Sequence, residues 1–146
     1  MHIQNSYTFD APPQAVWDLL VDIDAVAACL PGCESMDPIG EDKYRVVLTL
    51  GIAAITGRYE GTIEMTDLKP PSFYRLVVEG RGKPGFVTGG GAISLTASDN
   101  GTRIEVDGTV QVGGTIARVG QRLIGSVAKM MMDRFFACLQ KRLAPK

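Results

Sequence analysis

The hydrophobic and polar positions of this chain follow two different periods. Between Lys43 and Val112, apolar residues mostly alternate with polar ones, whereas after Gly114 they recur at steps of three and four. Alternation is typical of a β-sheet with one buried face, and steps of three and four are typical of an amphipathic helix. The chain therefore predicts a sheet followed by a long C-terminal helix.

The helical pattern runs over residues 115–143, and no proline interrupts it before Pro145. We expect one continuous helix of roughly 40 Å, at a rise of about 1.5 Å per residue. Gly113 and Gly114 precede it as a break from the last strand. Its apolar positions are Ile116, Val119, Leu123, Val127, Met130, Met131, Phe135, Leu139 and Leu143.

The first half of this helix is unusually poor in side-chain volume. Its small residues are Ala117, Gly120, Gly125, Ser126 and Ala128. Two interpretations are equally open, close packing of the helix against the sheet or space left for a ligand.

The N-terminal part predicts one strand and two short helices. Residues 3–9 alternate as a strand, and Asp10, followed by Ala11 and two prolines, is expected to cap the first helix. Asp22 is expected to cap a second helix over residues 23–29, which the following proline and glycine end.

Six antiparallel strands are expected between the short helices and the long one. Turns at 69–72, 83–85 and 98–101 separate several of them, and no crossover helix interrupts the series, so a parallel sheet is excluded as the main architecture. Gly89, Gly90 and Gly91 within one strand indicate a bulge, a bend or the close approach of another group. The fold class is therefore α+β, a curved antiparallel sheet of about seven strands around the C-terminal helix, in one domain over residues 1–146.

Composition and charge exclude several classes of protein. The 146 residues are 45% hydrophobic and 21% charged with a net charge of −1, which argues against a general nucleic-acid binder. Residues 115–146 hold seven basic side chains against one acidic residue, Asp133. We prefer a solvated helix face as the explanation, and a basic surface for an acidic partner or an anionic membrane is the alternative.

The N-terminus has no basic cluster or apolar run, and no stretch has the length of a membrane span, so we expect a cytoplasmic protein. In that compartment the three cysteines are expected to be free, partly buried thiols. The Cys29/Cys33 spacing fits no common zinc motif and His2 is the only histidine, so we expect no metal site and no cofactor.

The sequence offers no catalytic set. Residues 80–85 match G-x-G-x-x-G, but a strand is expected after them instead of the helix that a nucleotide site needs. A nucleophile would lack a base other than His2, and no carboxylate pair stands out. Tyr59 and Tyr74 fall on apolar strand faces, where they could bond to a polar ligand head group or belong to the core.

With this order of elements, the chain resembles the START-like (SRPBCC) helix-grip superfamily and, within it, the family of the G subunit of carbon monoxide dehydrogenase. The most specific part of the resemblance is the run Ala28-Cys29-Leu30-Pro31-Gly32-Cys33-Glu34-Ser35. The stretches 57–61, 112–114 and 116–136 are similar in kind and place.

The resemblance implies a hydrophobic-ligand fold that accompanies molybdenum-containing hydroxylases and serves in membrane recruitment of the dehydrogenase or in quinone handling. It supplies no catalytic residues. Some members carry a C-terminal extension that could anchor them, and because this sequence stops at Lys146 we expect at most peripheral contact with the inner membrane face.

We expect a non-enzymatic accessory protein that binds a lipophilic molecule such as a quinone or lipid between sheet and helix. The alternatives are a docking module for a hydroxylase without a ligand, and an enzyme of the polyketide cyclase or aromatase kind. The candidate ligand-binding residues are Tyr59, Ile63, Leu76, Val78, Phe86, Ile93, Leu95, Val106, Val110, Leu123, Val127 and Met131.

Overall fold

The computed structural model describes residues 1–52 and 55–143 of the chain. A seven-stranded, wholly antiparallel sheet has the order β1-β7-β6-β5-β4-β3-β2. The α+β class and the curved sheet predicted from the sequence are confirmed. The strands are β1 (His2–Phe9), β2 (Cys33–Gly40), β3 (Lys43–Leu50), β4 (Gly57–Lys69), β5 (Phe73–Gly82), β6 (Gly85–Ser98) and β7 (Gly101–Gly113).

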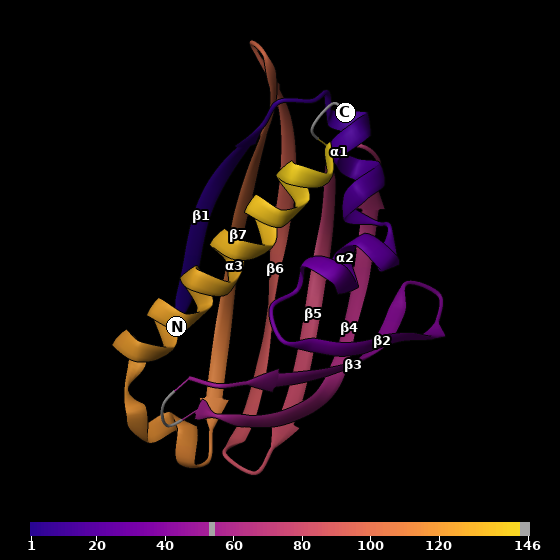
Figure 1. Cartoon of the computed structure of the whole chain (residues 1–146). Coiled ribbons are helices and arrows are strands. Elements are labelled where there is room, and N and C mark those ends of the chain that lie inside the picture. Colours follow the sequence, from indigo (N-terminus) through magenta and orange to yellow (C-terminus); the bar gives the residue numbers. More distant parts are fainter. Residues whose placement is uncertain (53–54, 144–146) are drawn as a thin grey trace.

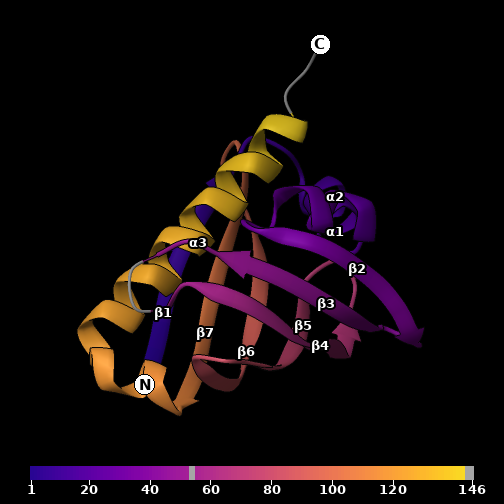
Figure 2. The ribbon, with the colours of Figure 1, turned by 60° about the horizontal axis from the view of Figure 1, so that its bottom comes forward.

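The helices lie on one side of this sheet (Figure 1). The short helices α1 (Pro13–Leu20) and α2 (Ile23–Cys29) join β1 to β2, as predicted. The long helix α3 (Gln121–Leu143) crosses the sheet diagonally. The strands β2 and β3 turn away from the direction of β5, β6 and β7, so the sheet bends around α3 (Figure 2).

Of the two predicted helix caps, the one at Asp22 is confirmed and the one at Asp10 was wrong. The carboxylate of Asp22 accepts hydrogen bonds from the backbone N–H groups of Asp24 and Ala25, and α2 has the predicted bounds. Asp10 does not cap α1, because the N-cap is Pro12, without a side-chain hydrogen bond. The carboxylate of Asp10 lies instead 3.5 Å from Nε2 of Gln140 on α3.

The predicted continuous helix from residue 115 was wrong at its start. A separate 3₁₀ helix, η2 (Thr115–Val119), comes first, and α3 begins only at Gln121. Gly120 between them has φ +91°, a conformation that side chains with a Cβ rarely adopt and that breaks an α-helix. The glycine therefore divides the apolar pattern into two elements.

The glycines of β6 act by close approach and not by a bulge. The pairing of β6 with β5 and β7 continues without a register shift through Gly89, Gly90 and Gly91 in the described sheet. A Cβ atom on Gly91 would lie 2.8 Å from the carbonyl oxygen of Asp107 and 2.8 Å from Cα of its partner Gly108. Side chains at this pair would push the two strands apart, so the glycines permit the tight curvature.

Two apolar clusters fill the space between sheet and helices. The first joins α1, α2 and the C-terminal half of α3 to one end of the sheet, with Trp17, Ile104 and Leu139 buried at its centre. The second, smaller cluster consists of Ile55, Ile116, Ile124 and Val127 with partly buried neighbours. The clusters lie at different ends of α3, and this difference determines where the candidate site is found.

The expectation of three free thiols was wrong. Cys29 at the end of α2 and Cys138 on α3 form a disulfide, with their Cα atoms 5.4 Å apart. The two cysteines are 109 residues apart in sequence, and only the packing of α2 on α3 brings them together. Cys33 remains a free, half-buried thiol, and burial raises its pKa.

Candidate functional site: an apolar cavity between sheet and helix

An apolar chamber of about 260 Å³ lies between the inner face of the sheet and the N-terminal half of α3. The sheet contributes apolar side chains from β3, β4, β5, β6 and β7, and the helical side contributes η2 and α3. We call this space the first chamber. The residues that line it are Val46, Leu48, Leu50, Ile55, Tyr59, Glu60, Gly61, Thr62, Ile63, Val78, Glu79, Gly80, Val87, Val110, Val112, Ile116, Ile124, Val127, Ala128 and Met131.

A second chamber of about 250 Å³ adjoins the first. The two share Val78, Val87, Val110 and Ala128 as lining residues. The other residues around the second chamber are Ile3, Leu76, Gly89, Gly90, Gly91, Ile93, Val106, Gly108, Thr109 and Met132. Together the chambers reach the range of about 300–1,000 Å³ that is typical of small-molecule sites.

Small residues create this space. Gly80 faces inward on β5, because Tyr74, Leu76 and Val78 alternate with it on the buried side. A Cβ atom there would have no heavy atom nearer than 3.8 Å. Ala128 on α3 borders both chambers, which favours the ligand-space interpretation for this one of the small helix residues.

The hydroxyl of Tyr59 is a polar side-chain group at the wall of the first chamber. Its side chain is 8% exposed, and its hydroxyl donates a hydrogen bond of 2.7 Å to the backbone carbonyl of Ile55. Burial raises the pKa of Tyr59 above its ordinary value, and the hydrogen bond to Ile55 engages the hydroxyl proton. Its one proton is therefore already used within the protein.

The structure brings most of the predicted site residues together. Tyr59, Ile63, Val127 and Met131 border the first chamber, whereas Leu76, Ile93 and Val106 border the second. Val78 and Val110 border both. Leu95 lies in the first core cluster and Leu123 packs on the second, and neither lines a chamber.

Phe86 lies on the opposite side of the sheet and is 48% exposed, so its predicted place in the cavity was wrong. Residues at even positions of β6 face outward, since Val87, Ile93 and Leu95 face inward at odd ones. Phe86 pairs with Gly113, whose missing side chain leaves room for the ring. The residue beside it, Val87, takes the inward place.

Several lining residues were missed on the helical side. Ile124 and Ala128 border the first chamber together with Val127 and Met131. These four residues occur at the spacing of one helix face, counted from Ile124. The predicted site included Val127 and Met131, but it took Leu123 in place of its neighbour Ile124 and omitted Ala128.

Tyr74 belongs to the core. It lies 4% exposed in the first cluster, with its ring edge-on to Trp17 at a centroid distance of 5.5 Å. It borders neither chamber. Trp17, in the same cluster, is therefore a poor reporter of ligand binding.

A separate, more polar cleft of about 520 Å³ lies between β1 and the C-terminal half of α3. At its edge the hydroxyl of Tyr7 donates to Asp133 at 2.8 Å, and Lys129 donates to the same carboxylate at 2.8 Å. These bonds, that from Lys129 first, lower the pKa of Asp133. Burial, with the neighbouring Asp133, raises the pKa of Tyr7. The contacts fasten β1 to α3.

Within residues 1–52 and 55–143, no group of three or more histidine, cysteine, aspartate or glutamate side chains is placed to hold a metal ion. None of the described helices is long and apolar enough to cross a membrane. The two adjoining apolar chambers are the candidate site.

Residues 6–144 match the CoxG family, described as the G subunit of carbon monoxide dehydrogenase. The chain belongs to this family. CoxG is a family of accessory subunits not known as catalytic, and membership supports an accessory role associated with carbon monoxide dehydrogenase.

Solved structures agree with the CoxG fold. A conserved protein from Geobacillus kaustophilus is 40% identical, with a TM-score of 0.95 over 97% of this chain and 94% of that one. A protein from Thermus thermophilus is 16% identical, with a TM-score of 0.71 over 97% and 96% of the two chains. A protein from Chromobacterium violaceum is 15% identical, with a TM-score of 0.73 over 99% of each chain. The last two show the fold alone, and no curated protein matches the chain.

The run that carried the resemblance to the CoxG family joins α2 to β2. Gly32 has φ +78°, and a Cβ atom there would lie 2.3 Å from the carbonyl oxygen of Thr49. The carbonyl of Gly32 accepts a hydrogen bond from the N–H of Thr49. Only glycine fits this approach of the connection to β3, which explains its place after Pro31.

Proposed function

We propose that this chain is a non-catalytic accessory protein of a molybdenum-containing carbon monoxide dehydrogenase system and carries a lipophilic molecule, such as a quinone or lipid, in its two chambers. The observation that carries the proposal is the pair of adjoining apolar chambers beneath α3. Membership in the CoxG family supports the association with the dehydrogenase.

The geometry gives little support to the cyclase or aromatase alternative. Such an enzyme needs polar groups free to act on a substrate inside the pocket. Tyr59 already donates its proton to Ile55, and Tyr74 lies outside both chambers. A carrier needs only apolar surface and space, and the chambers offer both.

The proposal is tested on protein purified without detergent and extracted with organic solvent. We expect mass spectrometry to find a lipophilic molecule in the extract, and the stripped protein to bind a fluorescent lipid analogue with saturation. Extracts without any lipophilic molecule, together with a linear, unsaturable fluorescence response, would rule the carrier function out.

A partner-docking function has a specific observation in its favour. Arg118 and Arg122 are exposed, and neither forms an ion pair within the described part of the chain. Lys129, by contrast, is paired with Asp133 at 2.8 Å on the same helix. We expect charge reversal of Arg118 and Arg122 to weaken co-purification with the dehydrogenase, with Lys141→Glu as the control at the other end of α3. Unchanged co-purification would remove this function.

A further inference from the structure

The inner wall of the cavity has almost no group that could recognise a polar ligand. Glu60, Thr62 and Glu79 border the first chamber, but each lies between inward-facing neighbours, so strand alternation directs its side chain to the outer face. Glu60 confirms this direction, since its carboxylate pairs with the exposed Arg45 and Arg58. These residues contribute backbone to the cavity wall and no charge to its interior.

Thr109 likewise borders the second chamber with its backbone only. It lies between Gly108 and Val110, which face inward on β7, so its side chain faces outward. Of the described residues that line the two chambers, Tyr59 is thus the one with an inward polar side chain, and its proton is held by Ile55 at 2.7 Å. A head group with carbonyl or carboxylate oxygens would find no hydrogen-bond donor inside and would lose its hydration.

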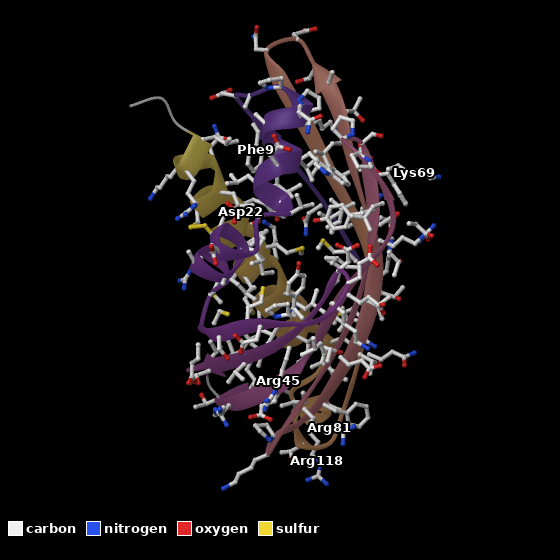
Figure 3. All side chains as sticks on the ribbon, turned by 90° about the vertical axis from the view of Figure 1, so that its right-hand side faces the viewer. Phe9, Asp22, Arg45, Lys69, Arg81 and Arg118 are labelled. Atoms are coloured by element: carbon white, nitrogen blue, oxygen red, sulfur yellow. A yellow bond between two sulfur atoms is a disulfide. The ribbon has the colours of Figure 1, made fainter. Side chains whose placement is uncertain are left out.

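The two ends of the cavity differ. Beyond the second chamber lies the first core cluster, where Tyr74, Ile104 and Leu139 are buried and close the space. The first chamber is bounded at the other end by Ile55 and by Ile116 of the short element η2. Figure 3 places Arg118 of η2 at the opposite end of the molecule from Phe9 of the first cluster. At the η2 end the wall is this short element, of which Thr115, Ala117 and Arg118 are exposed to solvent.

The two chambers are separated only by apolar side chains that border both. Their shared wall consists of three valine side chains and Ala128, and no charged side chain separates them. A ligand that fills both chambers must pass this apolar wall, and a flexible hydrocarbon chain does so more easily than a rigid ring system.

We propose that this cavity selects its ligand by the hydrocarbon chain and not by the head group. The chain fills both chambers, with its tip near Leu76, Ile93 and Val106, while the head group stays at the η2 end in contact with water. This inference rests on the proposed carrier function and deepens it by naming the part of the ligand that is recognised.

The expected signature is a dependence on chain length. Each methylene group transferred from water into the chambers should tighten binding by about fourfold. The gain should stop when the second chamber is full. Head groups on the same chain should differ in affinity by less than about threefold, because each remains hydrated.

The test uses the stripped full-length chain and displacement of bound dansylaminoundecanoic acid. One series runs from octanoate to stearate. A second compares a carboxylate, an alcohol and a benzoquinone that bear the same decyl chain. Steep dependence on chain length with little dependence on the head group is the expected result. Affinities that follow the head group and stay flat along the fatty acids would overturn the inference while leaving the carrier function in place.

Failure of the proposed function gives a different result, since neither the dansyl probe nor any competitor would then bind. In Val106→Phe the larger side chain fills part of the second chamber. The longest fatty acid that still gains affinity from added methylene groups should then be shorter, and the affinity for octanoate should be unchanged. Val77→Phe, on the exposed outer face of β5, is the matched control. An unchanged length limit in a folded Val106→Phe protein would contradict the placement of the chain tip, and if that variant does not fold, the two ligand series decide alone.

Discussion

The hydroxyl of Tyr59 donates a buried hydrogen bond of 2.7 Å to the backbone carbonyl of Ile55. The bond ties the start of β4 to Ile55 in the β3–β4 connection. In doing so it removes the one inward-facing polar side chain of the chambers from ligand recognition.

We therefore expect Tyr59→Phe to cost stability and to spare binding. Loss of the partner of a buried carbonyl should lower the free energy of unfolding by about 1 kcal/mol. Ligand affinity should change by less than about threefold, or roughly 0.7 kcal/mol. Urea unfolding and displacement of the dansyl probe measure the two quantities. A tenfold loss of affinity for a ligand with a polar head would instead mean that the hydroxyl turns toward it.

Ala128→Leu should abolish ligand uptake and stabilise the protein. Ala128 borders both chambers, so a leucine at this position would fill space that is now open. Filling a cavity commonly adds about 0.5–2 kcal/mol to the free energy of unfolding. Thermal unfolding and probe binding would be compared with Ser126→Leu, which adds the same side chain at an exposed position. Destabilisation of about 1–3 kcal/mol would indicate overpacking of a filled core and contradict an open cavity.

Removal of the disulfide should lower stability substantially. Cys29 and Cys138 enclose a loop of 109 residues, and closing a loop of this size stabilises a fold by roughly 3–5 kcal/mol in the chain-entropy description. We expect Cys138→Ala to reduce the free energy of urea unfolding by such an amount, and dithiothreitol to have no further effect on it. Cys33→Ala serves as the control. Alkylation of three thiols in the unreduced, unfolded wild-type protein would show that the bond is absent.

Asp133→Asn should destabilise the protein in a pH-dependent way. Hydrogen bonds from Lys129 and Tyr7 lower the pKa of Asp133 below its ordinary value of 3.8. A carboxylate with a lowered pKa stabilises the fold fully above the ordinary value, and the effect is lost as the pH falls through the lowered one. The variant should therefore be less stable than the wild type at neutral pH, and the difference should shrink in acid below the ordinary value. Urea unfolding of the wild type, Asp133→Asn and Tyr7→Phe at neutral pH and in acid measures the difference in the free energy of unfolding. If Asp133→Asn is destabilised equally at both pH values, the loss comes from packing and not from the charge of the carboxylate.

Much of the fold could be predicted because burial repeats with the period of the element. Ile104, Val106 and Val110 face inward along β7 as the alternation indicates. The turn at 98–101 and the cap by Asp22 depend on neighbouring residues and were also predicted correctly. These features follow from contacts between residues close in sequence.

The remaining features depend on contacts or angles that the sequence pattern does not carry. The left-handed φ of Gly120, which separates η2 from α3, leaves the apolar spacing nearly unchanged. Phe86 is apolar and next to an inward-facing residue, so hydrophobicity alone misplaced it by one position. The bond between Cys29 and Cys138 required knowing that α2 packs on α3. The cavity itself is defined by absent atoms, at Gly80 above all.

The covalent link at Cys138 restricts how α3 can move when a ligand enters. The C-terminal part of the helix is fastened to α2, whereas its other end begins after the left-handed Gly120. If α2 stays in place, an outward movement of α3 as a rigid body would therefore turn about Cys138. Ile124 lies about 21 Å along the helix axis from that pivot, so a rotation of only about 5° displaces it by about 2 Å. A small tilt about Cys138 would thus open the first chamber while the packing around the disulfide stays in place.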